Sequence, residues 1–404
     1  MSPIEIRVCE PDELAAGLTP IFHFFGRVPT NESLGGFGDV LEAERLHAAF
    51  DGGKAVGGAG AFSFTLTVPG GRVPAAGVTT VGVLPTHRRR GILRQMMRAQ
   101  LDDVHERGEP VAYLWASEST IYGRFGYGVA ALSGELEIAR NRAAFYSSWE
   151  PVGRARLLDH EEALEAIPPI YERVATETPG MFARAAEWWQ ARALADPEWR
   201  RSGGGEIVRV VVESDGAGEA YALYRLHPSF EHGSSTGWVN VIEAMGTTPA
   251  VTREIWRYLL DVDWMDRVRA RLLPVDHALF LLLAEPRRMR FTLEDSLWVR
   301  LVELEAALNA RSLAGDGSVV LEVADVFCPW NHGRWDVSAG GVERTQRGAD
   351  LRLDVAALGS AYLGGFTFSQ LAGGGRVDEL QPGALQRADA LFATGRAPWC
   401  PEIF

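Results

Sequence analysis

The stretch that decides the fold runs from Val81 to Arg94 and reads Val-Gly-Val-Leu-Pro-Thr-His-Arg-Arg-Arg-Gly-Ile-Leu-Arg. It predicts a strand that ends at Pro85, a basic loop, and a helix that begins near Gly91. Amides at a helix N-terminus have no partner within the helix, and the helix dipole adds partial positive charge there. Three consecutive arginines supply full charges, and the glycine allows close backbone approach. The stretch therefore predicts an anion site, and a pyrophosphate is the natural ligand.

An arginine triplet taken alone is more typical of a solvated loop. Here it stands before a helix N-terminus, where three positive charges oppose the dipole unless an anion joins them. The sequence contains no G-x-x-x-x-G-K-[ST] motif and no G-x-G-x-x-G after a strand. A Walker A loop is thereby excluded, and a Rossmann dinucleotide site is disfavoured.

The order of elements around this stretch occurs twice. In the first third of the chain, periodicity predicts two strands, a helix and a strand, at Ala61–Val68, Thr79–Leu84, Gly91–Arg107 and Val111–Ala116, with Gly57-Gly58 read as a turn. In the middle third it predicts strands at 206–213, 219–227 and 238–244, a helix capped by Thr248 with Pro249 at its first position, and a strand at 268–273. The repeated order predicts a diverged internal duplication.

The composition of the chain favours some classes of protein and argues against others. The chain has 404 residues, 47% of them hydrophobic and 23% charged, which predicts two to three soluble globular domains. Its net charge is 40 − 53 = −13, which argues against a nucleic-acid partner. Three scattered cysteines, no signal-peptide core and no long apolar run predict a cytoplasmic protein with no membrane contact. The nine histidines show no ligand spacing, so we expect no metal.

Two motifs carry a resemblance to a known family. Arg88-x-x-Gly91 between a strand and a helix resembles the acetyl-CoA motif of the GNAT superfamily of N-acetyltransferases, with Leu93 where that motif has Gly or Ala. Ala116–Gly128 and the chain end resemble the enhanced-intracellular-survival acetyltransferases of actinobacteria, which modify aminoglycosides and so confer antibiotic resistance. The resemblance covers the whole chain.

The resemblance implies an α/β fold with two GNAT acetyltransferase-like domains, the second degenerate, followed by an α+β sterol-carrier-protein-like domain. The expected boundaries are 1–150 for the acetyl-CoA-binding catalytic domain, 151–296 for the degenerate domain and 297–404 for the C-terminal domain. The degenerate domain carries Met245-Gly-Thr-Thr-Pro249 at the position of the pyrophosphate loop, without arginines. We expect the last domain to deliver the chain end to the active site, or to bind lipid.

The resemblance also implies roles for individual residues. The acetyl-CoA-binding residues would be the strand Val81, Gly82 and Val83 for the pantetheine arm, the turn Arg88, Arg89, Arg90, Gly91, Ile92, Leu93 and Arg94 for the pyrophosphate, and Ser117 and Glu118 beside the arm. Tyr122 would be the general acid, because it heads the pattern Tyr-Gly-Arg-Phe-Gly-Tyr, with Tyr127 as its competitor. A phenol suits this role because it is protonated at pH 7. The terminal carboxylate of Phe404 corresponds to the family's general base.

The function favoured by these residues is acetyl-CoA-dependent N-acetyl transfer to aminoglycosides or similar polyamines, by direct attack without a covalent enzyme intermediate. Glu402 would help to hold a substrate ammonium group. Trp188-Trp189 could line a sugar site, although a buried helix face is favoured. Acetylation of protein lysines or N-termini and a non-catalytic CoA or lipid sensor are the alternatives. The family suggests a homohexamer.

Overall fold

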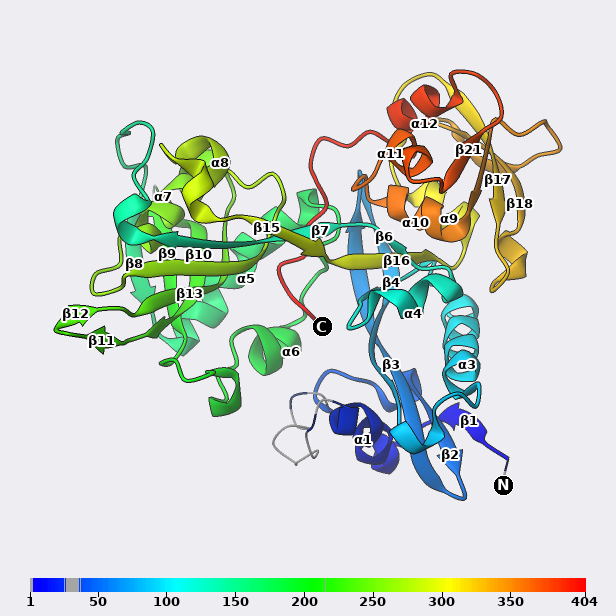
Figure 1. Cartoon of the computed structure of the whole chain (residues 1–404), viewed down its shortest axis with the longest axis horizontal. Helices are drawn as coiled ribbons and strands as arrows, with labels where there is room; N and C mark the ends of the chain where they lie inside the picture. Colours follow the sequence, from blue (N-terminus) through cyan, green and yellow to red (C-terminus); the bar gives the residue numbers. More distant parts are fainter. Residues whose placement is uncertain (1–2, 25, 27–35, 37, 215) are drawn as a thin grey trace. The chain divides into compact units, whose positions relative to one another are not determined.

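The computed structural model describes residues 3–24, 26, 36, 38–214 and 216–404. These residues form two compact units (Figure 1). The first comprises the chain up to Ala131, Ser296–Pro398 and Ile403–Phe404, and the second comprises Leu132–Asp295 and Trp399–Glu402. The tail of the chain therefore contributes to both units.

The first unit is built on a seven-stranded sheet. Its order is β1-β2-β3-β4-β5-β16-β6, and the strands span Glu5–Val8 (β1), Leu46–Asp51 (β2), Lys54–Val68 (β3), Gly71–Val83 (β4), Val111–Trp115 (β5), Leu297–Leu301 (β16) and Gly128–Val129 (β6). The helices of this part are α1 (Leu14–Phe24), α3 (Ile92–Glu106) and α4 (Ser119–Tyr122). The two strands predicted in the first third of the chain are confirmed as parts of β3 and β4. The helix and the strand predicted after them are confirmed as α3 and β5.

The prediction of a turn at Gly57-Gly58 is wrong, because both glycines lie inside β3. A Cβ on Gly58 would lie 2.4 Å from the carbonyl oxygen of Gly17 in α1. A Cβ on Gly57 would lie 3.0 Å from the sulfur of Met96 in α3. The glycines therefore allow helices to pack closely on the sheet, which is the other common reason for glycine within a strand.

The C-terminal part of the first unit has a five-stranded sheet of order β19-β18-β17-β20-β21. Its strands are Ser318–Ala324 (β17), Gly333–Ser338 (β18), Gly341–Arg344 (β19), Leu351–Asp354 (β20) and Val377–Glu379 (β21), and its helices are Leu304–Ala310 (α9), Val355–Tyr362 (α10), Phe368–Gly373 (α11) and Ala384–Phe392 (α12). The buried α10 packs against β16 and β6 of the first sheet. A buried ion pair in the same region joins Arg300 of β16 to Asp325, at 2.6 Å.

The second unit has a seven-stranded sheet of order β15-β7-β14-β13-β10-β9-β8. Its strands are Leu132–Ala139 (β7), Arg154–Leu158 (β8), Val208–Ser214 (β9), Ala217–His227 (β10), Trp238–Gly246 (β13), Arg267–Leu273 (β14) and Thr292–Asp295 (β15), with a hairpin of Phe230–Glu231 (β11) and Ser234–Ser235 (β12). The helices are His160–Glu177 (α5), Ala186–Trp188 (α6), Pro249–Leu260 (α7) and Leu279–Leu282 (α8). The predicted order of strands, helix and strand in the middle third is confirmed.

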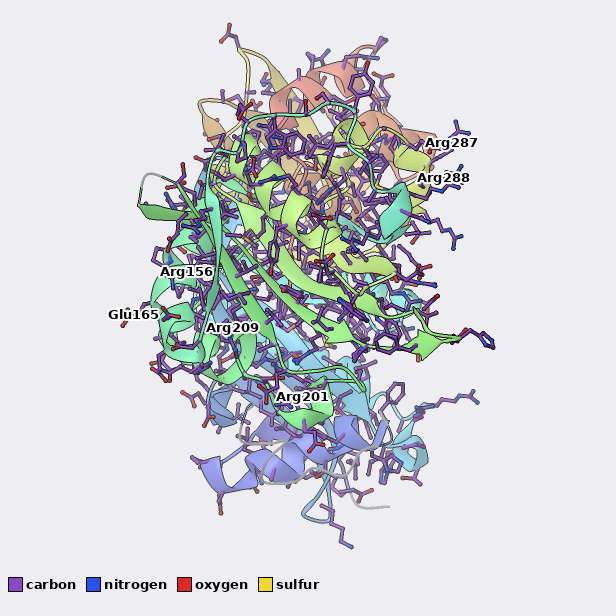
Figure 2. All side chains as sticks on the ribbon, turned by 90° about the vertical axis from the view of Figure 1, so that its left-hand side faces the viewer. Arg156, Glu165, Arg201, Arg209, Arg287 and Arg288 are labelled. Atoms are coloured by element: carbon purple, nitrogen blue, oxygen red, sulfur yellow. The ribbon has the colours of Figure 1, made fainter. Side chains whose placement is uncertain are left out.

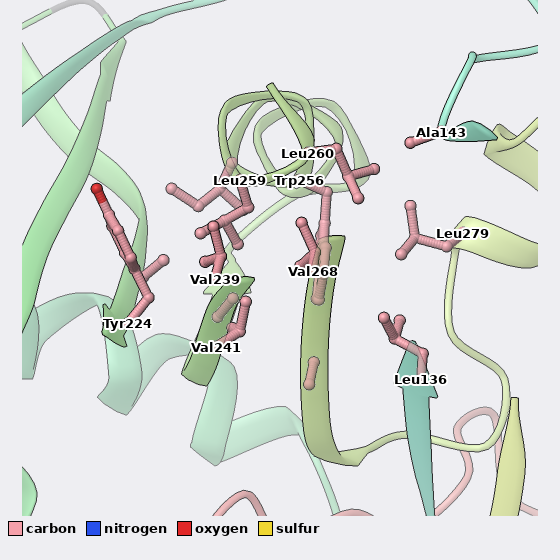
Figure 3. Packing of buried hydrophobic residues seen from close by; sticks show 14 of the residues in the cluster. Leu136, Ala143, Tyr224, Val239, Val241, Trp256, Leu259, Leu260, Val268 and Leu279 are labelled. Carbon is pink, nitrogen blue, oxygen red and sulfur yellow. The ribbon is translucent and has the colours of Figure 1, made fainter. Parts of the chain in front are cut away.

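Helix α7 begins where the sequence predicts. The hydroxyl of Thr248 accepts a hydrogen bond from the amide of Val251, and Pro249 occupies the first turn. The apolar face of α7 covers β13 and β14, where Trp256 and Leu259 pack against Val239, Val241 and Val268 (Figure 3).

Two strands lie in a different sheet from the one that the chain order suggests. β7 belongs to the second sheet although it precedes residue 150, and β16 belongs to the first sheet although it follows residue 296. The domain boundaries 1–150, 151–296 and 297–404 stay predictions.

The contact between β6 and α10 gives a test of the fold of the first unit. A Cβ on Gly128 would lie 1.8 Å from the carbonyl oxygen of Ala356, so Gly128→Ala forces the backbones of β6 and α10 apart. We expect it to lower the free energy of unfolding by about 1–3 kcal/mol or more, measured by denaturant titration. Gly317→Ala is the control, because no heavy atom of the described residues lies within 4 Å of that Cβ position. Equal stability of the two variants would contradict this packing.

Candidate active site

The candidate site lies where two parallel strands separate. β4 and β5 pair only at Ala75–Val111, Ala76–Ala112 and Gly77–Tyr113. Beyond Gly77, β4 continues to Val83 and pairs on its other side with β3. Among the described residues no strand pairs with the free side of Val78–Val83, so its backbone groups are available to an extended ligand.

A bulge sharpens this separation. The register between β3 and β4 shifts between Gly58 and Gly60, and Thr80 has φ of 52°. A threonine with a positive φ is an outlier that occurs at turns, bulges and functional sites. Val81, Gly82 and Val83 follow it, all half-buried. The three residues predicted to bind the pantetheine arm therefore form the end of β4 beyond the split.

The basic loop follows directly. A single 3-10 turn, Pro85–His87, leads through Arg88, Arg89 and Arg90 to Gly91. Gly91 is the N-cap of α3 and has a φ of 78°, a conformation that favours glycine. The first turn of α3 reads Ile-Leu-Arg-Gln, so no acidic side chain offsets the dipole. Ile92 is buried, Leu93 is half-buried and Arg94 is exposed. The loop thus presents a helix N-terminus together with positive side chains.

The three arginines differ in their surroundings. Arg90 is bound to Asp51 of β2 at 3.3 Å, and the same carboxylate lies 3.3 Å from the imidazole of His87. Arg88 and Arg89 are exposed, and the guanidinium of Arg88 lies 5.4 Å from the ring centre of Phe24. Arg89 has φ of 61°, a second strained position in the loop. Asp51 holds Arg90 in place, whereas Arg88 and Arg89 face the solvent.

Tyr122 ends the short helix α4 and is 5% exposed. Burial, with a smaller contribution from Glu118, raises the pKa of Tyr122 to about 12. Its ring lies edge-on to that of Tyr127, with ring centres 5.9 Å apart. Tyr127 is fully buried, and burial raises its pKa even further. Both phenols are therefore neutral at pH 7.

Phe404 lies at the place where β4 and β5 separate. Its ring packs edge-on against Tyr113 of β5 and Phe64 of β3, with ring centres 4.9 and 5.2 Å apart. A Cβ on Gly77 would lie 3.3 Å from this ring. The hydroxyl of Thr79 donates a hydrogen bond of 3.2 Å to an oxygen of the terminal carboxylate. The chain end is thus buried, with 7% of Phe404 exposed.

The tyrosine and the chain end approach opposite faces of the β4–β5 pair. Tyr122 packs in a buried cluster that includes Val78 of β4 and Leu114 of β5. Phe404 contacts the alternate positions Gly77, Thr79 and Tyr113. Because successive side chains in a strand point to opposite faces, a group lying between the separated strands would have the carboxylate on one side and the tyrosine cluster on the other.

The remaining predicted residues are Ser117, Glu118 and Glu402. Ser117 and Glu118 are exposed in the loop after β5. Glu402 has two partners in the second unit: its carboxylate is bound to Arg184 at 2.9 Å and accepts a hydrogen bond of 2.9 Å from the indole of Trp188. Its contact with a substrate ammonium group stays a prediction. Trp188 and Trp189 are 3% and 4% exposed, in agreement with the favoured interpretation of a buried face.

Sequence reasoning did not identify Thr79, Tyr113 or Arg184. Thr79 and Tyr113 lie on apolar strands and look like ordinary sheet residues, and only the pairing of β4 with β5 places them beside Phe404. Arg184 follows a buried Phe182, and nothing in the local sequence indicates that its side chain is buried.

No helix of the described residues combines the length and apolarity needed to cross a membrane. Within the same ranges, no group of three or more His, Cys, Asp or Glu side chains is arranged to hold a metal ion.

Comparison with known proteins gives three family matches along the chain. Residues 5–130 and 180–301 each match a model of an acetyltransferase (GNAT) domain, and residues 304–401 match a model of a sterol carrier protein domain. An uncharacterized N-acetyltransferase of Streptomyces avermitilis is 41% identical over 99% of both chains. N-acetyltransferase Eis of Mycobacterium tuberculosis is 36% identical, over 85% of this chain and 84% of its own.

The fold agrees with these matches. The crystal structure of Eis1 from Mycobacterium abscessus superposes with a TM-score of 0.87 at 37% identity, covering 99% of this chain and 100% of that one. A GCN5-related N-acetyltransferase from Anabaena variabilis shares the fold, with a TM-score of 0.84 at 22% identity over the whole of both chains.

The bond between Thr79 and the chain end can be tested through stability. Thr79→Val keeps the shape of the side chain but removes the donor, so it should cost about 1.5–3 kcal/mol, the usual value for a hydrogen bond to a charged group. Denaturant titration measures this cost. In a chain that lacks Phe404 the same substitution should cost almost nothing, because the acceptor is already gone. An equal cost in both backgrounds would show that Thr79 does not bind the carboxylate.

Proposed function

Since the chain belongs to the Eis family of GNAT N-acetyltransferases, we propose that it transfers the acetyl group of acetyl-CoA to amines of aminoglycosides or similar polycationic molecules. Family membership confirms the resemblance drawn from the motifs. It also confirms an α/β fold with two GNAT domains followed by a sterol-carrier-protein-like domain. The donor, the acceptor and the site residues are the proposed part.

The observation that carries the proposal is the split between β4 and β5, with a basic helix N-terminus at one end and the chain terminus beside it. Two parts of this site have the hydrogen-bonding groups and charges that acetyl-CoA needs. The free edge of Val81–Val83 suits the amides of a pantetheine arm, which can add to a strand edge through backbone hydrogen bonds. The amides that begin α3, together with Arg88 and Arg89, suit a pyrophosphate. When bound, acetyl-CoA supplies an activated acetyl thioester.

The chain's own groups would then move two protons. The carboxylate of Phe404 accepts a proton from the attacking amine as its nitrogen forms the new bond to the acetyl carbon. The hydroxyl of Tyr122 gives a proton to the sulfur as the carbon–sulfur bond breaks. Positioned acids and bases contribute about 10²–10⁴-fold each. A phenol with the ordinary pKa of about 10 is already protonated over the physiological range. Burial raises the pKa of Tyr122 further, to about 12.

Charge supports a cationic acceptor. The net charge of −13 attracts polycations over long distances. The terminal carboxylate, held by Thr79 in buried surroundings, is a specific anion at the site. In surroundings with little water, its attraction for an ammonium group is stronger than in solution.

The decisive experiment follows thiol release from acetyl-CoA in the presence of kanamycin, with a lysine-containing peptide as a second acceptor. We expect release that depends on kanamycin and a product whose mass is increased by one or more acetyl groups. Release only with the peptide would favour a protein acetyltransferase. Binding of acetyl-CoA without release from either acceptor would favour a sensor, and would contradict the proposal.

Tyr122→Phe tests the acid. The ring and its packing remain, but the donor is lost, so kcat should fall by about 10²-fold or more while the Kd for acetyl-CoA is unchanged. Tyr127→Phe is the matched control, since Tyr127 lies 5.9 Å away in the same cluster. A large loss of turnover in the Tyr127 variant and none in the Tyr122 variant would reassign the role.

Arg89→Glu tests the pyrophosphate site. Loss of one charge-assisted contact costs about 1.5–3 kcal/mol, so the Kd for acetyl-CoA should rise by about tenfold or more in isothermal titration. Arg287→Glu, which reverses the charge of an exposed arginine in the second unit (Figure 2), controls for net charge. If both variants bound acetyl-CoA as the wild type does, the loop would not be the anion site.

A further inference from the structure

The sheet of the second unit splits in the same way as the first. β13 and β14 pair in parallel from Trp238–Arg267 to Val241–Ala270. In the described part of the chain no β13–β14 pairs follow Val241, although β13 runs on to Gly246 and β14 to Leu273. Leu272 has φ of 56°, so β14 also carries an irregular residue beyond the split. This domain therefore retains the separated strands of a GNAT fold, without the arginine loop.

The chain's own tail occupies this split. The indole nitrogen of Trp399 donates a hydrogen bond of 2.5 Å to the carbonyl oxygen of Leu272. The backbone amide of Trp399 donates a second hydrogen bond, of 2.8 Å, to the carbonyl oxygen of Pro179. The Trp399 side chain packs in a buried cluster with Ile242 and Met245, both on β13 beyond the last parallel pair. Trp399 thus binds β14 directly and belongs to a cluster that includes residues of β13. Cys400 and Pro401, which follow it, are buried as well.

Glu402 is held in the same unit by a buried charge. Arg184, whose side chain is 1% exposed, binds Glu402 at 2.9 Å and Glu243 of β13 at 2.6 Å. Its guanidinium also lies 4.0 Å from the ring centre of Tyr171 and 4.8 Å from that of Trp189. The nearby carboxylates and Tyr171 raise the pKa of Arg184, against the opposing effect of burial, so its charge is permanent.

We propose that the second, degenerate domain serves as an anchor for the tail, and that Glu402 and Trp399 are positioning residues for the terminal carboxylate. This inference rests on the proposed function, in which the carboxylate of Phe404 is the base. Chain ends usually fray. Here Glu402 is fixed two residues before the terminus. Two extended residues span about 7 Å, so the terminal carboxylate lies within about 7 Å of this fixed point. Holding a reacting group in one place lowers the entropic cost of the reaction.

The anchor gives the Glu402 carboxylate a role that does not require contact with the substrate. This carboxylate binds Arg184 and Trp188, both of which are largely buried. A residue that binds the acceptor directly would change KM, whereas a residue that places the base would change kcat. The two roles are therefore separable by kinetics.

Glu402→Gln is the test. Arg184 keeps its pair with Glu243, so this buried guanidinium stays paired in the variant, which should fold. We expect kcat with kanamycin to fall by about tenfold, with KM for kanamycin and Kd for acetyl-CoA within about twofold of the wild type. In a chain that lacks Phe404, Glu402→Gln should have no further effect on the residual rate. Trp399→Phe, which removes the donor to Leu272, should give the same pattern.

Glu165→Gln is the matched control, because Glu165 is an exposed glutamate on α5 of the same unit (Figure 2). A rise in KM at constant kcat in Glu402→Gln would overturn the proposal and make Glu402 a substrate contact. An equal further loss in the chain without Phe404 would also overturn it, because the effect would then not act through the carboxylate.

Hydrogen exchange of the amides of Trp399, Cys400 and residues 402–404 gives a readout that does not depend on turnover. We expect protection in the wild type and in Glu165→Gln, and faster exchange in Glu402→Gln and Trp399→Phe. If the wild type showed no acetyl transfer, the proposed function would fail while faster exchange in these variants still supported the anchor. Unchanged exchange in both variants would overturn the anchor itself.

Discussion

The early end of pairing between β4 and β5 is the constraint on which the candidate site depends. Three parallel pairs, the last at Gly77–Tyr113, bring the strands together, and the bulge at Thr80 then directs β4 away. The free edge of β4, the basic loop that follows it and the place of Phe404 all derive from this separation. A continuous β4–β5 ladder would pair the backbone groups of Val81–Val83 and leave no edge for a ligand.

The local elements could be predicted because their signals are local. Thr248 with Pro249 marks the start of α7, and periodic apolar residues mark α3. The placement of β7 in the second sheet and of β16 in the first could not be predicted, because strand pairing is set by partners far along the chain. The prediction of a turn at Gly57-Gly58 was wrong because a turn and a close approach of helices to a strand both favour glycine, and the sequence does not tell them apart.

The candidate site was partly visible in the sequence. The motif around Arg88–Gly91 predicted the basic loop before α3, and the family resemblance supplied the roles proposed for Tyr122 and Phe404. Neither indicated that these two residues approach opposite faces of the split, since this depends on the alternation of β4 and β5. The surroundings of Glu402 were also not visible in the sequence, because Arg184, which binds its carboxylate, lies more than 200 residues earlier in the chain.

The most direct measurement of this account is the rate of acetyl transfer to kanamycin by a chain extended with one glycine after Phe404. The extension keeps every side chain but moves the carboxylate by about 3.8 Å. The account predicts that turnover falls by about 10²-fold or more, with the Kd for acetyl-CoA unchanged. Turnover equal to that of the unextended chain would contradict a catalytic role for the terminal carboxylate.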